Sequence, residues 1–331
     1  MNDVLALSES SPADIWLLLD DRAGNRNQCL GVAEALKLPF EHRDIEYNAL
    51  GALPNGMTGA SFLGLSRATK ENLMPPWPRL VIAAGRRTAG AARAIKRMSK
   101  GTTKIVQIMH PGQAGIREFD LVAVPSHDTV MGGPNLLTVQ GAPHSITAEV
   151  LMSAKDKWSE EFETLPGPRI AVFVGGDTRR KEFDSSMARE FGQAVNTMAV
   201  ESGGSLLIST SRRTSVVSAD AFLSQVSAPH VLYRWGNTDE NPYVGYLACA
   251  DATVVGGDSV SMASEACAGT KPVYIYAPPG FVMDKHARMH KALFEGGYAR
   301  PFGEPYSEWF HAPLNAATEI AAAIHGRLGI G

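Results

Sequence analysis

Residues 252–269 read ATVVGGDSVSMASEACAG, which is a short apolar strand, a glycine turn and a helix that stops at a glycine. At 100° per residue, this helix has one apolar and one polar face. The two faces consist of Val260, Ala263 and Cys267, and of Asp258, Ser261 and Glu265, respectively. The apolar face can pack on a sheet. The polar face is therefore expected at the carboxyl edge of that sheet, where open α/β sheets bind ligands.

The polar face of this helix predicts a nucleotide site. Free N–H groups at Ser259, Ser261 and Met262 could hold a phosphate. Glu265 lies about one turn deeper and could accept hydrogen bonds from ribose hydroxyls. The alternative is a surface helix capped by Asp258 or Ser259, with Glu265 in solvent. The pattern alone does not decide between the two.

The same strand–loop–helix unit opens each half of the chain. Ile15–Leu19 runs into Asp20–Asn25, and Ile170–Val174 runs into Gly175–Thr178. Most predicted strands are continuously apolar, as in parallel sheets covered on both faces. We therefore predict an α/β protein with two Rossmann-like parallel-sheet domains that face a cleft. The predicted strands are Ile15–Leu19, Arg43–Tyr47, Leu80–Ala84, Lys104–Met109, Leu121–Val124, Ile170–Val174, Ser205–Thr210, Val231–Tyr233, Ala252–Val255 and Val273–Tyr276.

The boundary between the halves is expected near residues 148–168. Residues 149–165 are polar and helical in character, and Pro166-Gly167-Pro168 precedes a new strand. A length of 331 residues suits two domains of ordinary size. Ala316–Leu328 predicts one final amphipathic helix.

Composition limits the function. The net charge of −3 gives no indication of nucleic-acid binding. Three widely spaced cysteines form no disulfide framework or zinc motif, and no other pattern predicts a metal site. The first apolar run, Ile15–Leu19, is too short for a signal peptide or a membrane span. We expect a cytoplasmic protein, and a peripheral contact with the inner face of the membrane stays open.

The second half offers two further phosphate-binding candidates. Gly175 and Gly176 follow a strand, and glycines let backbone approach a pyrophosphate closely. Ser211, Arg212 and Arg213 follow the next strand, where arginines are well placed for an anion. The alternatives are an ordinary βα turn and an exposed basic turn. We expect Arg213 and its neighbours to surround one phosphate-sized position together with the amides of 259–262.

The first half offers polar groups at the matching strand ends. Asp20 and Asp21 could act as a general base, unless Asp21 or Asn25 only caps the helix. Arg87 follows the third predicted strand, and His127 follows the fifth. His127 could be a base or a hydrogen-bond donor, although a single histidine in a loop is more often merely exposed.

Several ordered motifs together resemble the mitochondrial fission ELM family over nearly the whole chain. These motifs are Asp21–Asn25 with Gln28 and Gly31, Phe119–Asp128, Ser211–Thr214, Asn241–Tyr243, Asp258–Ala266 and Lys271–Val273. The resemblance implies that Gly24, Asn25 and Gln28, together with Arg87 and His127, lie on the side of the site that holds the acceptor of the reaction.

The family in turn looks like GT-B glycosyltransferases. The helix that carries Glu265 is similar to the nucleotide-sugar helix of the lipid-linked glycosyltransferase of peptidoglycan synthesis, where a Glu holds the ribose and a Gly-rich loop faces the diphosphate. The resemblance implies these roles for Glu265 and for Gly175-Gly176. That enzyme's first glycine loop carries a His where Asp20-Asp21 stand here. The resemblance also implies that residues 1–150 form the domain on the acceptor side and that residues 151–310 form the domain that binds the nucleotide-sugar. It further implies a terminal helix within 311–331 that packs back toward the first domain.

Three functions remain open. The first is an inverting, metal-independent glycosyltransferase that uses a nucleotide-sugar as substrate, needs no cofactor, and acts on a lipid-linked or envelope glycan. The second is a nucleotide-sugar epimerase, for which His127, Asp128 and Glu265 are candidate acid and base groups. The third is a non-enzymatic membrane-fission adaptor, with Asn48–Pro78 as the interaction surface. Fold likeness alone does not decide among them.

Overall fold

The computed structural model describes residues 14–128, 132–178 and 181–331, which form two compact units. The first unit holds residues 14–124, 132–138 and 317–331, and the second holds 125–128, 139–178 and 181–316. The division thus lies earlier than the predicted 148–168, because the loops that follow the last two strands of the first sheet pack with the second unit. The terminal helix belongs to the first unit from Ala317 onward.

The first unit is a six-stranded sheet in the order β2-β1-β3-β4-β5-β6. The registered pairs from β2 through β5 are parallel. The strands are β1 (Ile15–Leu19), β2 (Phe40–Asp44), β3 (Leu80–Ala84), β4 (Lys104–Ile108), β5 (Leu121–Pro125) and β6 (Leu136–Val139). The helices are α1 (Ala23–Leu36), α2 (Asn55–Thr58), α3 (Arg67–Asn72), α4 (Ala89–Met98) and α11 (Ala316–Leu328), with 3-10 turns at η1 (Ala49–Ala52) and η2 (Ile116–Glu118).

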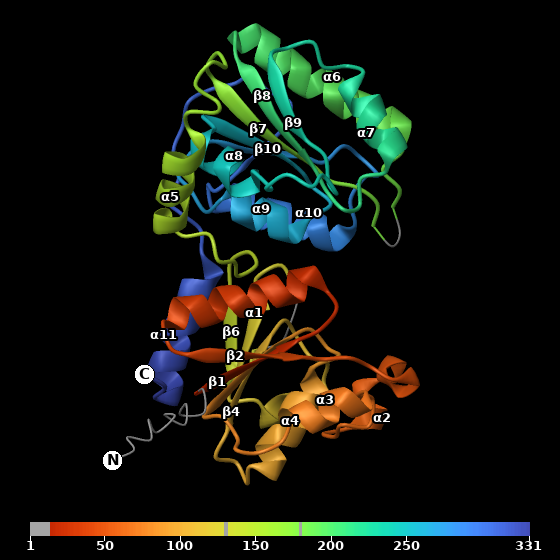
Figure 1. Ribbon diagram of the computed structural model, residues 1–331, viewed down its shortest axis with the longest axis vertical. Helices are drawn as coiled ribbons and strands as arrows, with labels where there is room; N and C mark the ends of the chain where they lie inside the picture. Colours follow the sequence, from red (N-terminus) through yellow and green to blue (C-terminus); the bar gives the residue numbers. More distant parts are fainter. Residues whose placement is uncertain (1–13, 129–131, 179–180) are drawn as a thin grey trace, which may run out of the picture. The chain divides into compact units, whose positions relative to one another are not determined.

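The second unit is a six-stranded parallel sheet in the order β12-β11-β10-β7-β8-β9. Its strands are β7 (Arg169–Val174), β8 (Ser205–Thr210), β9 (His230–Tyr233), β10 (Ala252–Gly256), β11 (Val273–Tyr276) and β12 (Arg300–Pro301). Its helices are α5 (Ala148–Trp158), α6 (Ser185–Ser202), α7 (Val216–Leu223), α8 (Tyr243–Cys249), α9 (Val260–Ala266) and α10 (Asp284–Glu295). Figure 1 shows both sheets with their helices. This strand order is the Rossmann order, and the predicted class of parallel-sheet α/β domains is confirmed.

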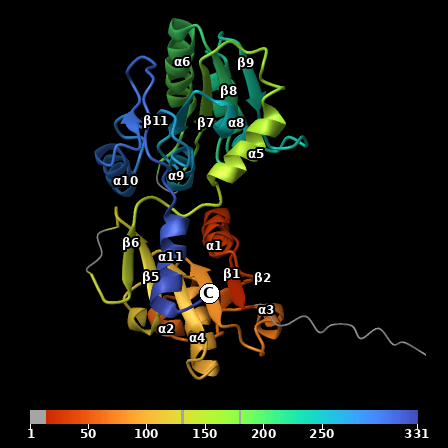
Figure 2. The ribbon, with the colours of Figure 1, turned by 90° about the vertical axis from the view of Figure 1, so that its left-hand side faces the viewer.

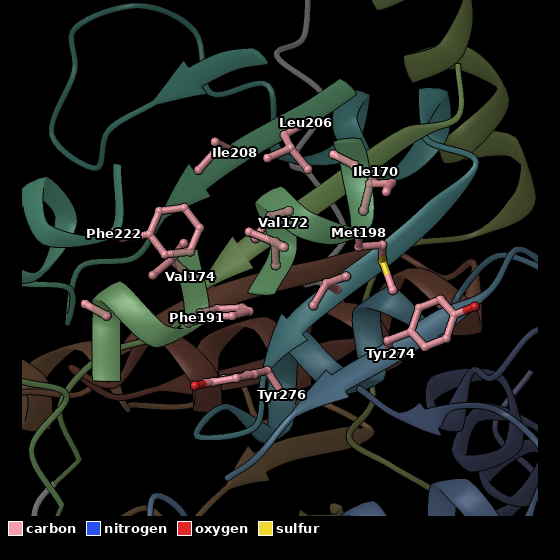
Figure 3. Close-up of a cluster of buried hydrophobic side chains, with 14 of the residues drawn as sticks. Ile170, Val172, Val174, Phe191, Met198, Leu206, Ile208, Phe222, Tyr274 and Tyr276 are labelled. Atoms are coloured by element: carbon pink, nitrogen blue, oxygen red, sulfur yellow. The ribbon is translucent and has the colours of Figure 1, made fainter. Parts of the chain in front are cut away.

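The core of the second unit explains why its strands are apolar without alternation. Ile170, Val172 and Val174 of β7 pack with α6 and α7 on one face of the sheet (Figure 3). Ala171 and Phe173, the residues between them, pack with α8, α9 and α10 on the other face. Figure 2 shows α6 and α9 on opposite faces of this sheet. Since successive side chains of a strand point to opposite faces, both sets must be apolar.

Each sheet has one place where the chain reverses the direction in which it adds strands. In the first unit this switch point lies between β1 and β3, and in the second it lies between β7 and β10. Ligands of open α/β sheets bind in the crevice outside the carboxyl ends of the strands at such a point. The loops after these four strands therefore decide where the site of each unit lies.

The predictions for the edges of the sheets were partly wrong. The second strand covers Phe40–Asp44 instead of Arg43–Tyr47, and β6 and β12 were not predicted. The β2 sequence is FEHRD, whose residues are half-buried or exposed. An edge strand of this kind has no run of apolar residues. The prediction depended on such runs and was therefore centred on the buried Ile45, which follows β2.

Candidate functional site

The switch point of the second unit is built around one buried carboxylate. Asp258 follows β10, and its side chain is 0% exposed. Its Oδ2 accepts a hydrogen bond from the Gly176 amide at 3.1 Å and pairs with Arg213 Nη2 at 2.6 Å. Arg213 Nη1 also donates to the Asp177 carbonyl at 3.0 Å. The loops after β7, β8 and β10 are thus joined through Asp258. Burial raises the pKa of Asp258, and the Arg213 guanidinium opposes that rise.

The two glycines after β7 have a packing reason in this arrangement. A Cβ on Gly175 would lie 1.6 Å from Asp258 Oδ1, and a Cβ on Gly176 would lie 2.1 Å from the Arg213 carbonyl carbon. Both positions therefore require glycine so that the three loops can approach one another. The Gly176 amide is already used by Asp258, so contact of Gly175-Gly176 with a diphosphate stays a prediction.

The predicted anion loop after β8 is a tight turn with one exposed arginine. Ser211 Oγ accepts from the Arg213 amide at 3.2 Å, and Thr214 Oγ1 donates to the Gly175 carbonyl at 2.6 Å. These bonds fix the turn against β7. Arg212 is exposed, whereas Arg213 is held by Asp258. Of the two predicted guanidiniums, Arg212 is the one that projects into solvent.

Helix α9 has the two faces that its sequence predicts. Ala263 and Cys267 are fully buried in the core, and Val260 packs against the same cluster. Ser259 is the N-cap, and its Oγ accepts from the Met262 amide at 3.3 Å. The capping alternative therefore describes Ser259 correctly. Of the three predicted phosphate-binding positions, the amide of Met262 is used by this cap.

Glu265 on the polar face is neither solvated nor a cap. It is half-buried, and the Tyr243 hydroxyl donates to its Oε2 at 2.6 Å. The Tyr243 ring rests against Phe173, with ring centroids 4.4 Å apart. Burial raises the pKa of Glu265, and the Tyr243 hydrogen bond opposes that rise. Tyr243 begins α8 and was quoted above only as part of a family motif. No spacing rule could have paired it with a residue 22 positions away.

His127 lies with the second unit, although it was predicted on the acceptor side with the first. Arg288 Nε donates to its carbonyl at 3.0 Å, which ties the loop after β5 to α10. His127 is buried, contrary to the expectation for a loop histidine. Burial lowers its pKa to about 4, and Lys285 and Arg288 act in the same direction.

The switch point of the first unit holds the other predicted polar residues. Asp20 is buried, and both of its oxygens accept from Asn25 Nδ2, at 3.1 and 3.0 Å. Asp21 is exposed and pairs with Arg87 Nη1 at 2.7 Å. The Arg87 guanidinium lies 3.8 Å from the centroid of the Tyr47 ring. Asp20 therefore anchors the start of α1, and Asp21 is the accessible carboxylate.

Asn25 on α1 lies directly against a glycine, Gly85. Gly85 follows β3 with φ of +77°, and a Cβ there would lie 2.7 Å from Asn25 Nδ2. Gln28 is buried and Gly24 is exposed on the same helix. The loop after β3 can thus close over Asn25 only because residue 85 has no side chain.

Neither a metal-binding group of side chains nor a membrane-spanning helix occurs among the described residues. No group of three or more His, Cys, Asp and Glu side chains there could hold a metal ion. Within the same residues, no helix is long and apolar enough to cross a bilayer.

Comparisons with known proteins agree on family and fold. Residues 23–328 match the family described as mitochondrial fission ELM1. A protein of Rickettsia prowazekii, RP120, is 29% identical over 96% of this chain and 99% of its own length. Mitochondrial fission protein ELM1 of Arabidopsis thaliana is 30% identical over 81% of this chain and 68% of its own length.

Among solved structures, UDP-GlcNAc 2-epimerase from Methanocaldococcus jannaschii is similar with a TM-score of 0.54. That match has 11% identity and covers 96% of this chain and 99% of the epimerase. At this identity the likeness concerns the fold, which is the two-sheet GT-B-like architecture described above. The family match over residues 23–328 shows that this chain belongs to the mitochondrial fission ELM1 family.

Proposed function

We propose that the protein binds a nucleotide-sugar at the carboxyl edge of its second sheet and transfers the sugar to an acceptor in an inverting, metal-independent reaction. The observation that carries this proposal is the Glu265–Tyr243 pair. It presents an oriented, half-buried carboxylate on the helix that follows a switch-point strand. Switch points of parallel sheets are where nucleotides bind.

Glu265 is suited to a ribose. A carboxylate has two oxygens with several acceptor positions, which match a pair of vicinal hydroxyls. Tyr243 occupies Oε2 from one side and fixes the plane of the carboxylate. Within the described part of the chain, Tyr243 is the only hydrogen-bond partner recorded for the Glu265 side chain. Oε1 is therefore the oxygen that we assign to a ribose hydroxyl.

The diphosphate would lie toward the loops after β7, β8 and β10. Arg212 supplies an exposed cation there, and the amides of Ser259 and Ser261 lie at the start of α9. Preorganised N–H groups and guanidiniums can stabilise the charge of a departing diphosphate without a metal. Arg213 and Gly176 would act through Asp258, because both already contact it.

The acceptor would be deprotonated by the first unit. Asp21 is our candidate base, because it is exposed whereas both oxygens of Asp20 are used by Asn25. Arg87 pairs with Asp21 and would hold it in position. By the family resemblance the acceptor is a lipid-linked or envelope glycan, met at the membrane surface.

Two other functions have an observation in their favour. The similar solved structure with the TM-score of 0.54 is a UDP-GlcNAc 2-epimerase, which favours epimerisation of the same class of ligand. The adaptor role is favoured by the Arabidopsis relative, whose name includes mitochondrial fission, and by exposed apolar side chains in Asn48–Pro78. These include Met57 and Leu63, which are 70% and 48% exposed. Large exposed apolar residues that occur together are typical of interaction surfaces.

Glu265→Gln is expected to weaken binding of a nucleoside diphosphate by about 1–2 kcal/mol, or roughly five- to thirty-fold. The amide keeps an acceptor for Tyr243 but loses the charge that strengthens the bond to ribose. Titration calorimetry with uridine, adenosine and guanosine diphosphates measures the change. Wild-type protein should prefer the ribonucleotide over its 2′-deoxy form, and the variant should not.

Two variants serve as controls for Glu265→Gln. Glu201→Gln makes the same change on the exposed surface of α6 and should leave affinity unchanged. Tyr243→Phe keeps the ring on Phe173 but removes the hydroxyl, so it should weaken the ribose preference without removing the carboxylate. If the wild-type protein binds no nucleotide at millimolar concentration, the nucleotide-sugar proposal is wrong and the adaptor role gains support.

A further inference from the structure

Besides His144, whose Nε2 bonds the Leu314 carbonyl, three buried histidines among the described residues of the second unit have ring nitrogens without hydrogen-bond partners. His286 and His290 lie one turn apart on α10, and His127 comes from the loop after β5. All three residues are less than a tenth exposed. Within the described residues, both nitrogens of His127, Nδ1 of His286 and Nε2 of His290 make no hydrogen bond. Buried polar atoms are nearly always paired, so this many unpaired nitrogens in one unit require an explanation.

The histidines lie at the switch point. A Cβ on Gly257 would be 2.7 Å from His290 Cε1, so the glycine turn after β10 brings that ring against the loop that carries Asp258. A backbone hydrogen bond with Gly257 holds the ring there. The Oδ1 atom of Asp258 is also buried and unpaired within the described residues. The unpaired atoms thus gather where an open α/β sheet binds its ligand.

The charges around the three rings favour an anion. His127 faces Asp128, Lys285, Arg288 and His286. His286 faces Arg213 and Lys285, and His290 faces the other two histidines. Two carboxylates near the rings are paired with cations, Asp128 with Lys285 at 3.2 Å and Asp258 with Arg213 at 2.6 Å, and Asp128 Oδ1 also lies 3.9 Å from His127 Nε2. Arg288 is a third cation there, and it donates to a backbone carbonyl.

Burial keeps the three imidazoles neutral at pH 7. It lowers the pKa of His127 and of His290 to about 4, and it also lowers the pKa of His286. An anion placed among the rings would reverse this effect, since an opposite charge nearby favours the protonated form.

We propose that His127, His286 and His290 form a phosphate-binding subsite that takes up a proton together with its ligand. This inference rests on the proposed function, because the subsite would hold one phosphate of a nucleoside diphosphate. Phosphate oxygens would accept hydrogen bonds from the unpaired nitrogens, and the proton would come from solvent and stay on an imidazole. No covalent step is involved.

Calorimetry with inorganic pyrophosphate tests the subsite without assuming a nucleotide. The titration is done at pH 6, 7 and 8 in buffers of different ionisation enthalpy, which gives the number of protons taken up. We expect wild-type protein to bind roughly tenfold more weakly at pH 8 than at pH 6 and to take up as much as one proton at pH 6. Pyrophosphate itself takes up protons in this pH range. Only the difference in proton uptake between wild type and a variant therefore reports on the histidines.

The informative variant is the double change His286→Asn and His290→Gln. The Asn amide can replace the unpaired Nδ1, and the Gln amide can replace the unpaired Nε2, but neither can take up a proton. The double variant should still bind, with its proton uptake and its excess pH dependence reduced to the share of His127. A triple variant that adds His127→Gln should bind without histidine-dependent proton uptake. His230→Gln, which changes an exposed histidine of the same unit, should behave as wild type. Thermal unfolding at pH 7.5 shows that each variant is folded.

The possible outcomes separate this inference from the proposed function. If nucleoside diphosphates bind with a ribose preference that depends on Glu265, but proton uptake is the same in wild type and triple variant, the subsite is wrong and the nucleotide proposal stands. If pyrophosphate binds with histidine-dependent proton uptake and no nucleotide binds, the subsite stands and the nucleotide proposal is wrong. If neither ligand binds, both are wrong.

Discussion

Arg213→Ala is expected to lower the free energy of unfolding by about 3 kcal/mol. The substitution leaves the Asp258 carboxylate buried without its cation, and breaking such a pair costs about 3–5 kcal/mol. Arg213 itself is 32% exposed, so water can enter the space it leaves, and the lower end of that range applies. Urea denaturation at pH 7.5, with folded signal followed by tryptophan fluorescence, measures the loss.

Two further variants decide whether the loss comes from the ion pair. Arg212→Ala removes the adjacent, exposed guanidinium and should change stability by no more than about 0.5 kcal/mol. Adding Asp258→Asn to Arg213→Ala removes the buried charge and keeps an acceptor for the Gly176 amide, so most of the lost stability should return. If Arg213→Ala is as stable as Arg212→Ala, Asp258 is not held by Arg213 in solution.

Acid is expected to destabilise the second unit through its buried histidines. The pKa values of His127 and His290 are lowered to about 4 from an ordinary value of 6.5. Above pH 6.5 neither the folded nor the unfolded chain protonates these rings, and the full stability is present. As the pH falls from 6.5 toward 4, the unfolded chain takes up protons that the folded chain does not, so stability is lost. At pH 5 the loss is about 2 kcal/mol for each histidine, or about 4 kcal/mol for both.

His127→Leu isolates one of these contributions. Both of its ring nitrogens are unpaired within the described residues, so an apolar side chain loses no hydrogen bond recorded there. Between pH 7.5 and pH 5, the free energy of unfolding should fall by about 2 kcal/mol less in the variant than in wild type. Urea denaturation at both pH values measures the difference. His230→Leu, at an exposed position, should keep the wild-type pH dependence. Parallel curves for wild type and His127→Leu would mean that His127 titrates normally and is not buried in solution.

The predictions for Arg213 and for the buried histidines concern neighbouring groups of the second unit. Arg213 faces both Asp258 and His286, so its loss would remove a positive charge from the histidines and raise the pKa of His286. A ligand phosphate would act on the histidines in the same direction. Stability, pH dependence and ligand binding are therefore linked at the carboxyl edge of the second sheet.

The sequence by itself determined the class of fold and the inner strands. Ile15–Leu19, Leu80–Ala84 and Val273–Tyr276 have the predicted bounds, because a strand buried on both faces is apolar along its whole length. The packing face of α9 was also predictable, since helical periodicity alone places Ala263 and Cys267 on one side. The edge strands β2, β6 and β12 were not predictable in this way, because a short or half-exposed strand carries no such run.

The polar partners at the site were decided only by tertiary structure. Asp258 was predicted on the polar face of the helix, and the fold places Arg213 and Gly176 against it. Glu265 was predicted at the ligand, and the fold adds Tyr243. These contacts join loops that follow different strands of one parallel sheet. Their sequence separation depends on the length of the intervening helices, so no periodicity relates the partners. What brings them together is that parallel strands end at one edge, and strand order decides which of those ends are neighbours.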